Sequence, residues 1–205
     1  MATQSETQIL CYLKNLINTP RPSGFTHQLI DQISQQLSQW NCPHQITRKG
    51  GILISLPGKD EQNRRMITAH IDTLGAMVKE VKTDGRLRLS NVGGFNWNAV
   101  EGAYVTVHTA SGKEYRGTIL HEKSSIHIHR DCGSLPRDDE SMELRLDLPT
   151  TSAQESLALG INIGDFISFD PNYEFTASGF IKARHLDDKA AVALLLYLLE
   201  ESAKY

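Results

Sequence analysis

The sequence predicts an α/β fold that is interrupted by an inserted small β-barrel domain. At both ends of the 205-residue chain, apolar helical segments alternate with short strand-like segments, as they do in α/β domains. From Gly75 onward the chain instead breaks into short strand-like pieces separated by turn residues, which is typical of small barrels and sandwiches. We therefore assign residues 1–74 and 172–205 to one domain, and residues 75–171 to a domain inserted into it.

Helical spacing of apolar residues predicts two helices at the start, over residues 3–17 and 25–40. The prolines of the intervening "NTPRP" end the first helix, because proline disfavours the helical conformation of the residue before it. Three short strands are predicted next, over residues 45–48, 52–56 and 65–69. The third is an apolar run that ends in His70-Ile71-Asp72, and we expect it to be buried.

The inserted region is predicted to form strands over residues 77–81, 87–89, 104–109, 115–120, 126–129 and 143–148, with another in "GINIGDFISFD". An exposed loop over 133–142 and a short helix over 152–159 complete it. A strand over 179–183 and a turn at residues 186–188 then lead into a helix over 189–201. This last helix is apolar around most of its circumference, so we expect it to be buried on several sides.

Composition excludes several classes of partner. The net charge of -3, without a clustered run of basic residues, gives no indication of nucleic-acid binding. No apolar run approaches the roughly 20 residues that span a bilayer, and the start of the chain lacks a signal-peptide pattern. The cysteines Cys11, Cys42 and Cys132 are odd in number and not in CxxC spacing, which argues against a disulfide framework or structural zinc site. We expect a cytoplasmic protein.

His70 and Asp72 are the first candidate site. Side chains two residues apart on a strand point to the same face, so both can face one pocket. A metal-bound histidine usually donates its other ring N–H to a carboxylate, which fixes the tautomer. The alternative is a structural histidine that is hydrogen-bonded by its neighbour, and the short pattern alone favours that alternative.

Asp187 and Asp188 form the second candidate site, between a predicted strand and an apolar helix. A carboxylate here could bridge two metal ions, because two adjacent acids beside apolar segments are costly without a cation. The alternative is that they cap the amino terminus of the helix, which is the commoner use of such residues.

His127 and His129 alternate with isoleucines and would share one strand face, where they could bind a metal. No cysteine or carboxylate at suitable spacing completes a set, so the favoured interpretation is a polar strand face. No serine lies in a nucleophile elbow, and the glycine pairs are not in a phosphate-binding context.

Considered together, these segments resemble the M42 family of metallo-aminopeptidases, which includes the glutamyl aminopeptidases. The resemblance rests on "AHIDTLGAMV" and, more than a hundred residues later, on "FIKARHLDDKAAVALLLYLLE". "NTPRPSG" resembles the amino-terminal turn of the family. "NVGGFNWNAVEGAYVTVHTASGKEYRGTI" and "LGINIGDFISFD" resemble the start and the end of its inserted β domain.

This resemblance implies a zinc-peptidase-like α/β/α catalytic domain that removes amino-terminal residues from peptides through two divalent metal ions, zinc or cobalt. It makes His70 a ligand of one metal and Asp187 the ligand that bridges both. Asp72 becomes the catalytic-site carboxylate that orients His70, and Asp188 supports the bridging residue, through a strained peptide link between the two aspartates. It also implies a homo-oligomer, from dimer to dodecamer, formed through the inserted domain.

The chain departs from the family in one respect. The family's catalytic glutamate and its remaining glutamate, aspartate and histidine ligands lie beyond the bridging aspartate, whereas only seventeen residues follow Asp188 here. Glu200-Glu201 lies near the end of the helix that starts after Asp188 and is interpreted as a solvated helix end. We therefore expect the amino-terminal portion of a longer polypeptide, not competent as a peptidase alone.

Two alternative functions remain open. One is a metal-dependent deacylase or amidase of a small N-acylated peptide, because residues 96–102 (NWNAVEG) resemble a branch of the family associated with an acetylated dipeptide. The other is a truncated, non-catalytic interaction module, which the missing ligands favour.

Overall fold

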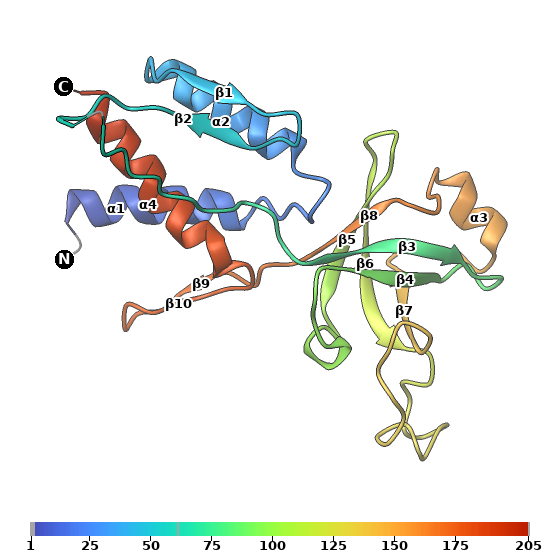
Figure 1. The fold of residues 1–205 in the computed structure, drawn as a ribbon. Coiled ribbons are helices and arrows are strands. Elements are labelled where there is room, and N and C mark those ends of the chain that lie inside the picture. The colour runs from blue at the N-terminus through green and yellow to red at the C-terminus, as the bar shows by residue number, and fades with distance from the viewer. Residues whose placement is uncertain (1–2, 61, 205) are drawn as a thin grey trace. The chain divides into compact units, whose positions relative to one another are not determined.

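A computed structural model describes residues 3–60 and 62–204 (Figure 1). The chain divides into two compact units, one formed by Met1–Asp72 and Pro171–Tyr205 and the other by Thr73–Asp170. These limits lie within two residues of the domain limits expected from the sequence. Whether the units serve as a catalytic and an oligomerisation domain stays a prediction.

The first unit contains helices and short antiparallel strand pairs. The helices are α1 (Gln4–Ile17), α2 (His27–Gln39) and α4 (Leu186–Ser202). Strand β1 (His44–Ile46) pairs with β2 (Ile52–Ile54), and β9 (Glu174–Phe175) pairs with β10 (Ile181–Lys182). The two helices predicted at the start of the chain are therefore confirmed, with ends that differ by no more than two residues.

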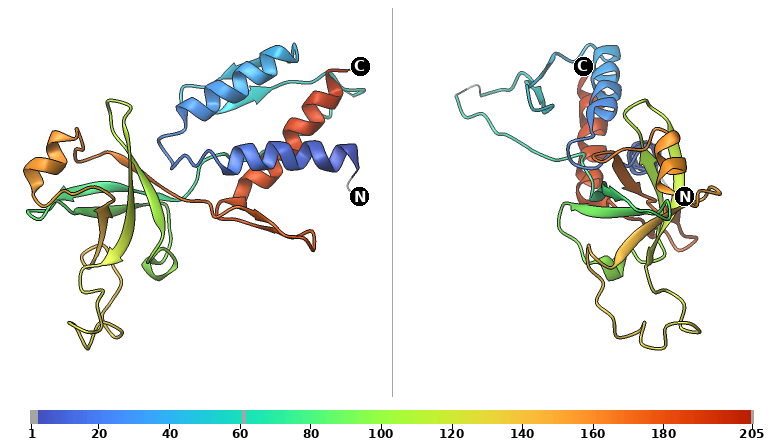
Figure 2. Two further views of the ribbon diagram at one scale, coloured as in Figure 1. Left: turned by 180° about the vertical axis from the view of Figure 1, so that it is seen from behind. Right: turned by 90° about the vertical axis from the view of Figure 1, so that its right-hand side faces the viewer.

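Helix α1 begins at a capping box. The Thr3 hydroxyl accepts a hydrogen bond from the Glu6 backbone N–H, and the Glu6 carboxylate accepts one from the Thr3 N–H, so two of the helix's unpaired donors are satisfied. The opposite face buries Leu13, Leu16 and Ile17. Helix α4 packs against this face, and the two helices lie side by side in Figures 1 and 2.

The expectation that the last helix is buried on several sides is wrong. Helix α4 buries Val192, Ala193 and Leu196 in the core shared with α1 and α2. Leu194 and Leu198, one helical turn apart, remain 50% and 55% exposed. Among the described residues, the other elements of this unit cover one side of α4 only, which leaves an apolar stripe on its surface.

The expected buried strand over residues 65–69 is also wrong. The segment has no strand assignment, and Met66 and Ile67 are 79% and 71% exposed. Its composition is that of a strand, but a strand needs a hydrogen-bonded neighbour, and none of the described strands pairs with it. Ala69 and Ile71, further along, do pack against the core of this unit.

The second unit is a closed barrel of six strands in the order β3-β4-β7-β6-β5-β8. These are β3 (Gly75–Val81), β4 (Leu87–Val92), β5 (Tyr104–His108), β6 (Glu114–His121), β7 (Met142–Leu146) and β8 (Phe166–Phe169). A 3-10 turn (Trp97–Ala99) and helix α3 (Ala153–Ala158) lie in the connections. Alternate residues such as Val105, Val107, Ile119 and Leu144 fill the interior, so the barrel has its own core.

One strand predicted in this unit is absent. Residues 126–129 lie in turns within the connection between β6 and β7, and Ile126 and Ile128 are exposed. Their alternation with histidines has the period of a strand, but no described strand pairs with them.

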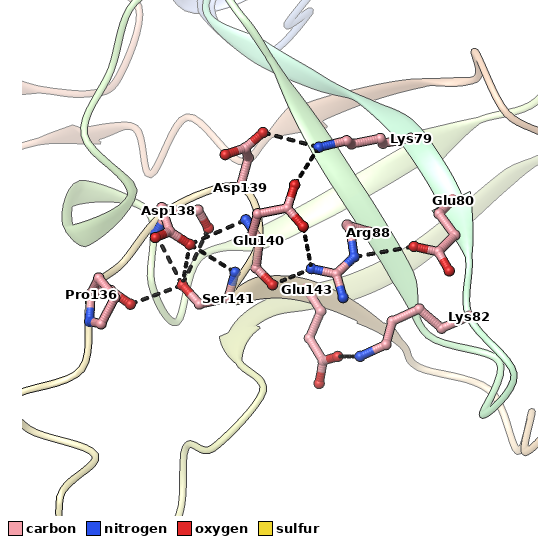
Figure 3. A network of polar contacts seen from close by, with 10 residues as sticks. All are labelled: Lys79, Glu80, Lys82, Arg88, Pro136, Asp138, Asp139, Glu140, Ser141 and Glu143. Carbon is pink, nitrogen blue, oxygen red and sulfur yellow. Dashed lines mark hydrogen bonds and ion pairs between the residues drawn. The ribbon is translucent and has the colours of Figure 1, made fainter.

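Ion pairs and a hydrogen bond hold the carboxyl-terminal end of this connection against the barrel (Figure 3). Lys79 on β3 contacts the carboxylates of Asp139, at 3.1 Å, and Glu140, at 2.7 Å. Arg88 on β4 donates a hydrogen bond to the Glu140 backbone carbonyl. Glu143, which follows in β7, is buried and paired with Lys82 and Arg86, so its charge is compensated inside the protein.

Within the described residues, no helix combines the length and the apolarity needed to cross a membrane.

Lys189 joins the start of α4 to the end of α1. It is fully buried, and its Nζ donates to the backbone carbonyls of Leu16, at 2.7 Å, and Thr19, at 2.8 Å. Burial, with a smaller effect of the Arg21 charge, lowers the pKa of Lys189 to about 7. Leu16 is in the last turn of α1, and Thr19 lies two residues beyond its end, so the amine holds the segment in which α1 ends.

We expect Lys189→Ala to lower the free energy of unfolding of the first unit by about 2–4 kcal/mol, because it removes a buried side chain and leaves a carbonyl without its donor. Lys189→Met keeps most of the volume and should cost less, about 1–2 kcal/mol. Urea unfolding followed by the fluorescence of Trp40 in a Trp97→Phe background reports on this unit. The exposed Lys14→Ala is the control, and a Lys189→Ala variant as stable as this control would contradict the assigned role.

Candidate functional site

His70 and Asp72 lie in the segment that leads into β3, and both belong to the first unit. Their neighbours Ala69 and Ile71 pack against the core of that unit, whereas the side chains of His70 and Asp72 are 53% and 40% exposed. His70 Nδ1 lies 3.2 Å from Asp72 Oδ1. The expected pairing of this imidazole with this carboxylate is therefore present in the structure.

Asp187 reaches the other side of the same ring. Its Oδ1 lies 3.2 Å from His70 Nε2, although the two residues are 117 positions apart in the sequence. Asp187 is carried by the first turn of α4, whose packing against α1 brings it to this place. The side chain of Asp187 is 94% exposed, whereas that of His70 is 53% exposed, so the pair opens to solvent.

The carboxylates of Asp72 and Asp187 favour the protonated form of the His70 ring. Partial burial acts to lower the pKa of His70, but the charge of Asp72 and the hydrogen bond with Asp187 together outweigh it and raise that pKa above its usual range. The ring is thus held in a position where either nitrogen can donate to a carboxylate or, once deprotonated, act as a ligand.

The backbone departs from helical geometry at the two aspartates. Asp187 (φ -83°, ψ 111°) and Asp188 (φ -117°, ψ 27°) are not helical, and the peptide bond between them is cis. The turn predicted at residues 186–188 is displaced: residues 184–185 form the turn, and 186–188 belong to α4 although its backbone is not helical at the two aspartates. Asp188 is partly buried, and its role in supporting Asp187 stays a prediction.

His70 Nε2 and Asp187 Oδ1 have the chemistry and spacing of two zinc ligands. Zinc binds imidazole nitrogen and carboxylate oxygen at about 2.0–2.2 Å, so two such ligands on one tetrahedral ion lie about 3.3 Å apart. The observed 3.2 Å agrees with this value. Two ligands are fewer than the three protein ligands usual for catalytic zinc, and in residues 3–60 and 62–204 no group of three candidate ligands occurs. The residues present therefore fit part of a metal site.

The other candidate ligands are not brought together. His127 and His129 lie in a turn of the second unit, not on a shared strand face. Glu200 lies in α4, as expected for a helix end, and accepts a hydrogen bond from the Tyr12 hydroxyl at 2.9 Å.

Sequence reasoning missed two residues of this region. Ser23 donates a hydrogen bond from its hydroxyl to Asp72 Oδ2. Lys189 is buried directly after the two aspartates. A signal existed for Lys189, a lone cation at the start of a strongly apolar helix. For Ser23 the sequence indicated only a turn. It did not indicate that the serine hydroxyl would contact Asp72.

The sequence and the fold both match those of known proteins. The sequence profile described as M42 glutamyl aminopeptidase matches residues 50–205. The chain is 51% identical to "Putative aminopeptidase YhfE" of Bacillus subtilis over 189 residues, which are 92% of this chain and 55% of that protein. It is 27% identical to the glutamyl aminopeptidase of Lactococcus lactis over 92% of this chain and 53% of that protein.

A solved structure shares the fold. The TET1 peptidase of Pyrococcus horikoshii superimposes with a TM-score of 0.80 at 23% identity, over 94% of this chain and 56% of that one. The chain thus spans about half the length of the relatives that it matches. Because the profile covers most of the chain and YhfE is half identical to it, the chain belongs to the M42 glutamyl aminopeptidase family.

Proposed function

We propose that this chain supplies the amino-terminal half of a metal-dependent aminopeptidase, which hydrolyses amino-terminal residues of peptides at a site of two divalent metal ions, zinc or cobalt. The observation that carries the proposal is that His70 and Asp187 face each other at 3.2 Å across 117 residues of sequence. Membership of the M42 family, whose relatives here are named as aminopeptidases, supports the reaction class.

In this proposal each residue has one task. Asp72, whose Oδ1 lies 3.2 Å from His70 Nδ1, would accept a hydrogen bond from Nδ1–H and leave Nε2 as the ligand atom. His70 Nε2 would be a ligand of one metal ion, and the Asp187 carboxylate, with two oxygens, would be shared by both. Asp188 supports Asp187 from the start of α4. When bound, the metal ions polarise the scissile carbonyl and lower the pKa of a bound water.

The remaining ligands and the proton-transferring glutamate are proposed to lie in the part of the M42 fold that this chain does not match. This agrees with the coverage of about half of each relative and with the presence of two facing ligands here. The zinc-peptidase-like α/β/α domain is part of the same proposal. A homo-oligomer is proposed as well, because the TET1 peptidase of P. horikoshii can assemble into a tetrahedron or a large octahedral shell.

We expect the 205-residue chain to bind Zn²⁺ with an affinity in the micromolar range or weaker, because two protein ligands hold zinc poorly. His70→Ala and Asp187→Ala should each abolish this binding in isothermal titration calorimetry. His127→Ala, an exposed histidine of the barrel unit, is the matched control and should bind as the native chain does. Unchanged zinc binding in both the His70→Ala and the Asp187→Ala variants would contradict the proposal.

The substrate is tested on a polypeptide that contains this chain together with the rest of the M42 fold. We expect it to release the first residue of dipeptides with a free amino group and to leave the N-acylated dipeptides intact. Preference for the N-acylated dipeptides would support the deacylase alternative, and no turnover of either, with metal bound, would support a non-catalytic role.

A further inference from the structure

Residues 65–69 have the composition of a strand and no partner strand. Ala69 packs against the core of the first unit, whereas Met66 and Ile67 are 79% and 71% exposed. Among the described contacts, no backbone hydrogen bond joins this segment to another one. A row of unpaired backbone donors and acceptors is a template on which a further strand can be added.

Helix α4 presents a second apolar surface in the same unit. Leu194 and Leu198 are 50% and 55% exposed, although Val192 and Leu196 of the same helix lie in the core. A helix that is apolar on more than one side is expected to have neighbours on more than one side. In the part of the chain that the structure describes, α4 has its main neighbour in α1.

The position of these side chains distinguishes them from other exposed apolar residues. Isolated apolar side chains on a surface are ordinary, and those of the second unit include Ile126, Ile128 and Ile163, which all lie in turns. Residues 65–69 and the exposed side of α4 instead belong to segments that already contribute to the core of the first unit. They extend that core outward to a surface that the described residues leave uncovered.

The relatives indicate what covers this surface. The TET1 peptidase of P. horikoshii shares the fold over 94% of this chain, with a TM-score of 0.80, but this chain covers only 56% of that one. It likewise covers 55% of YhfE of B. subtilis. Proteins that contain this fold thus carry much further chain, which can cover the uncovered face of the first unit.

We propose that residues 65–69 and the side of α4 that carries Leu194 and Leu198 are docking surfaces for the part of the M42 fold that this chain does not match. A strand of that part pairs with residues 65–69, and its apolar side chains cover the two leucines. Because residues 65–69 lead directly into His70, this pairing also holds the backbone beside the candidate site. The inference rests on the proposed function only in taking the rest of the M42 fold as the partner.

The first test is amide hydrogen exchange at residues 65–69. The probe is the part of B. subtilis YhfE that lies outside its match with this chain, joined to the carboxyl end of this chain in one polypeptide. We expect exchange at residues 65–69 to be slower in the joined polypeptide than in the 205-residue chain by about 100-fold or more, because the amides become paired. Equal protection of the barrel strands in both polypeptides shows that both are folded.

The second test uses matched substitutions. Ile67→Asn is compared with Ile163→Asn, because both isoleucines are 71% exposed, and Leu198→Asn is compared with Leu157→Asn, because both leucines are exposed residues of helices. In the joined polypeptide, Ile67→Asn and Leu198→Asn should lower the midpoint of thermal unfolding by several degrees, since their side chains are covered there. Ile163→Asn and Leu157→Asn should change it little. In the 205-residue chain all four should have small effects, as surface substitutions do.

Unchanged exchange at residues 65–69 would overturn the proposal, as would equal destabilisation by Ile67→Asn and Leu198→Asn with and without the joined part. A second copy of this chain is the competing occupant. A dimer of the 205-residue chain in sedimentation equilibrium that Leu198→Asn dissociates would overturn the choice of partner.

The same polypeptide separates this inference from the proposed function. Protection of residues 65–69 without hydrolysis of dipeptides in the presence of Zn²⁺ supports the docking surface and contradicts the proposed reaction. Hydrolysis without that protection supports the reaction and overturns the docking surface.

Discussion

The buried amine of Lys189 holds the first unit in the form that creates its site. Helix α4 lies against α1, and Lys189 bonds the first turn of α4 to the carbonyls at the end of α1. This attachment, together with the apolar packing of α4 against α1, places the start of α4, and Asp187 lies two residues before Lys189. Without this docking, His70 and Asp187 would be joined only through more than a hundred residues of intervening chain. Burying a lysine that has no carboxylate partner in the described contacts is costly, and this burial lowers the pKa of the amine to about 7.

The barrel accounts for the long stretch of sequence that separates the two halves of the site. Its strands begin at Gly75 and its last strand ends at Phe169, and all of its pairings close within residues 75–169. Its core is formed by its own side chains and is distinct from the core of the first unit. The chain leaves the first unit after Asp72 and returns to it at Pro171, so the insertion separates the two halves in sequence without contributing to the core that joins them.

Much of this fold follows from local patterns in the sequence, and the failures have a common cause. The spacing of Leu13, Leu16 and Ile17 predicts α1, and the alternation of Val105 and Val107 predicts a barrel strand, because each pattern reports one face of one element. Residues 65–69 and 126–129 have the composition of strands but no partner among the described strands, and pairing is a property of distant residues. Only the family resemblance predicts that His70 and Asp187 lie close together, since no local pattern relates two positions so far apart. Ser23 was not found, because a turn pattern does not show what its side chain meets.

The central claim is that His70 and Asp187 together hold a metal ion. The most direct measurement is a crystal structure of the chain soaked with Zn²⁺, with anomalous diffraction recorded at the zinc edge. The account predicts an anomalous peak about 2.0–2.2 Å from both His70 Nε2 and an Asp187 carboxylate oxygen. An anomalous peak only at other residues, such as His127 and His129, or no peak at a zinc concentration that saturates binding in solution, would contradict it.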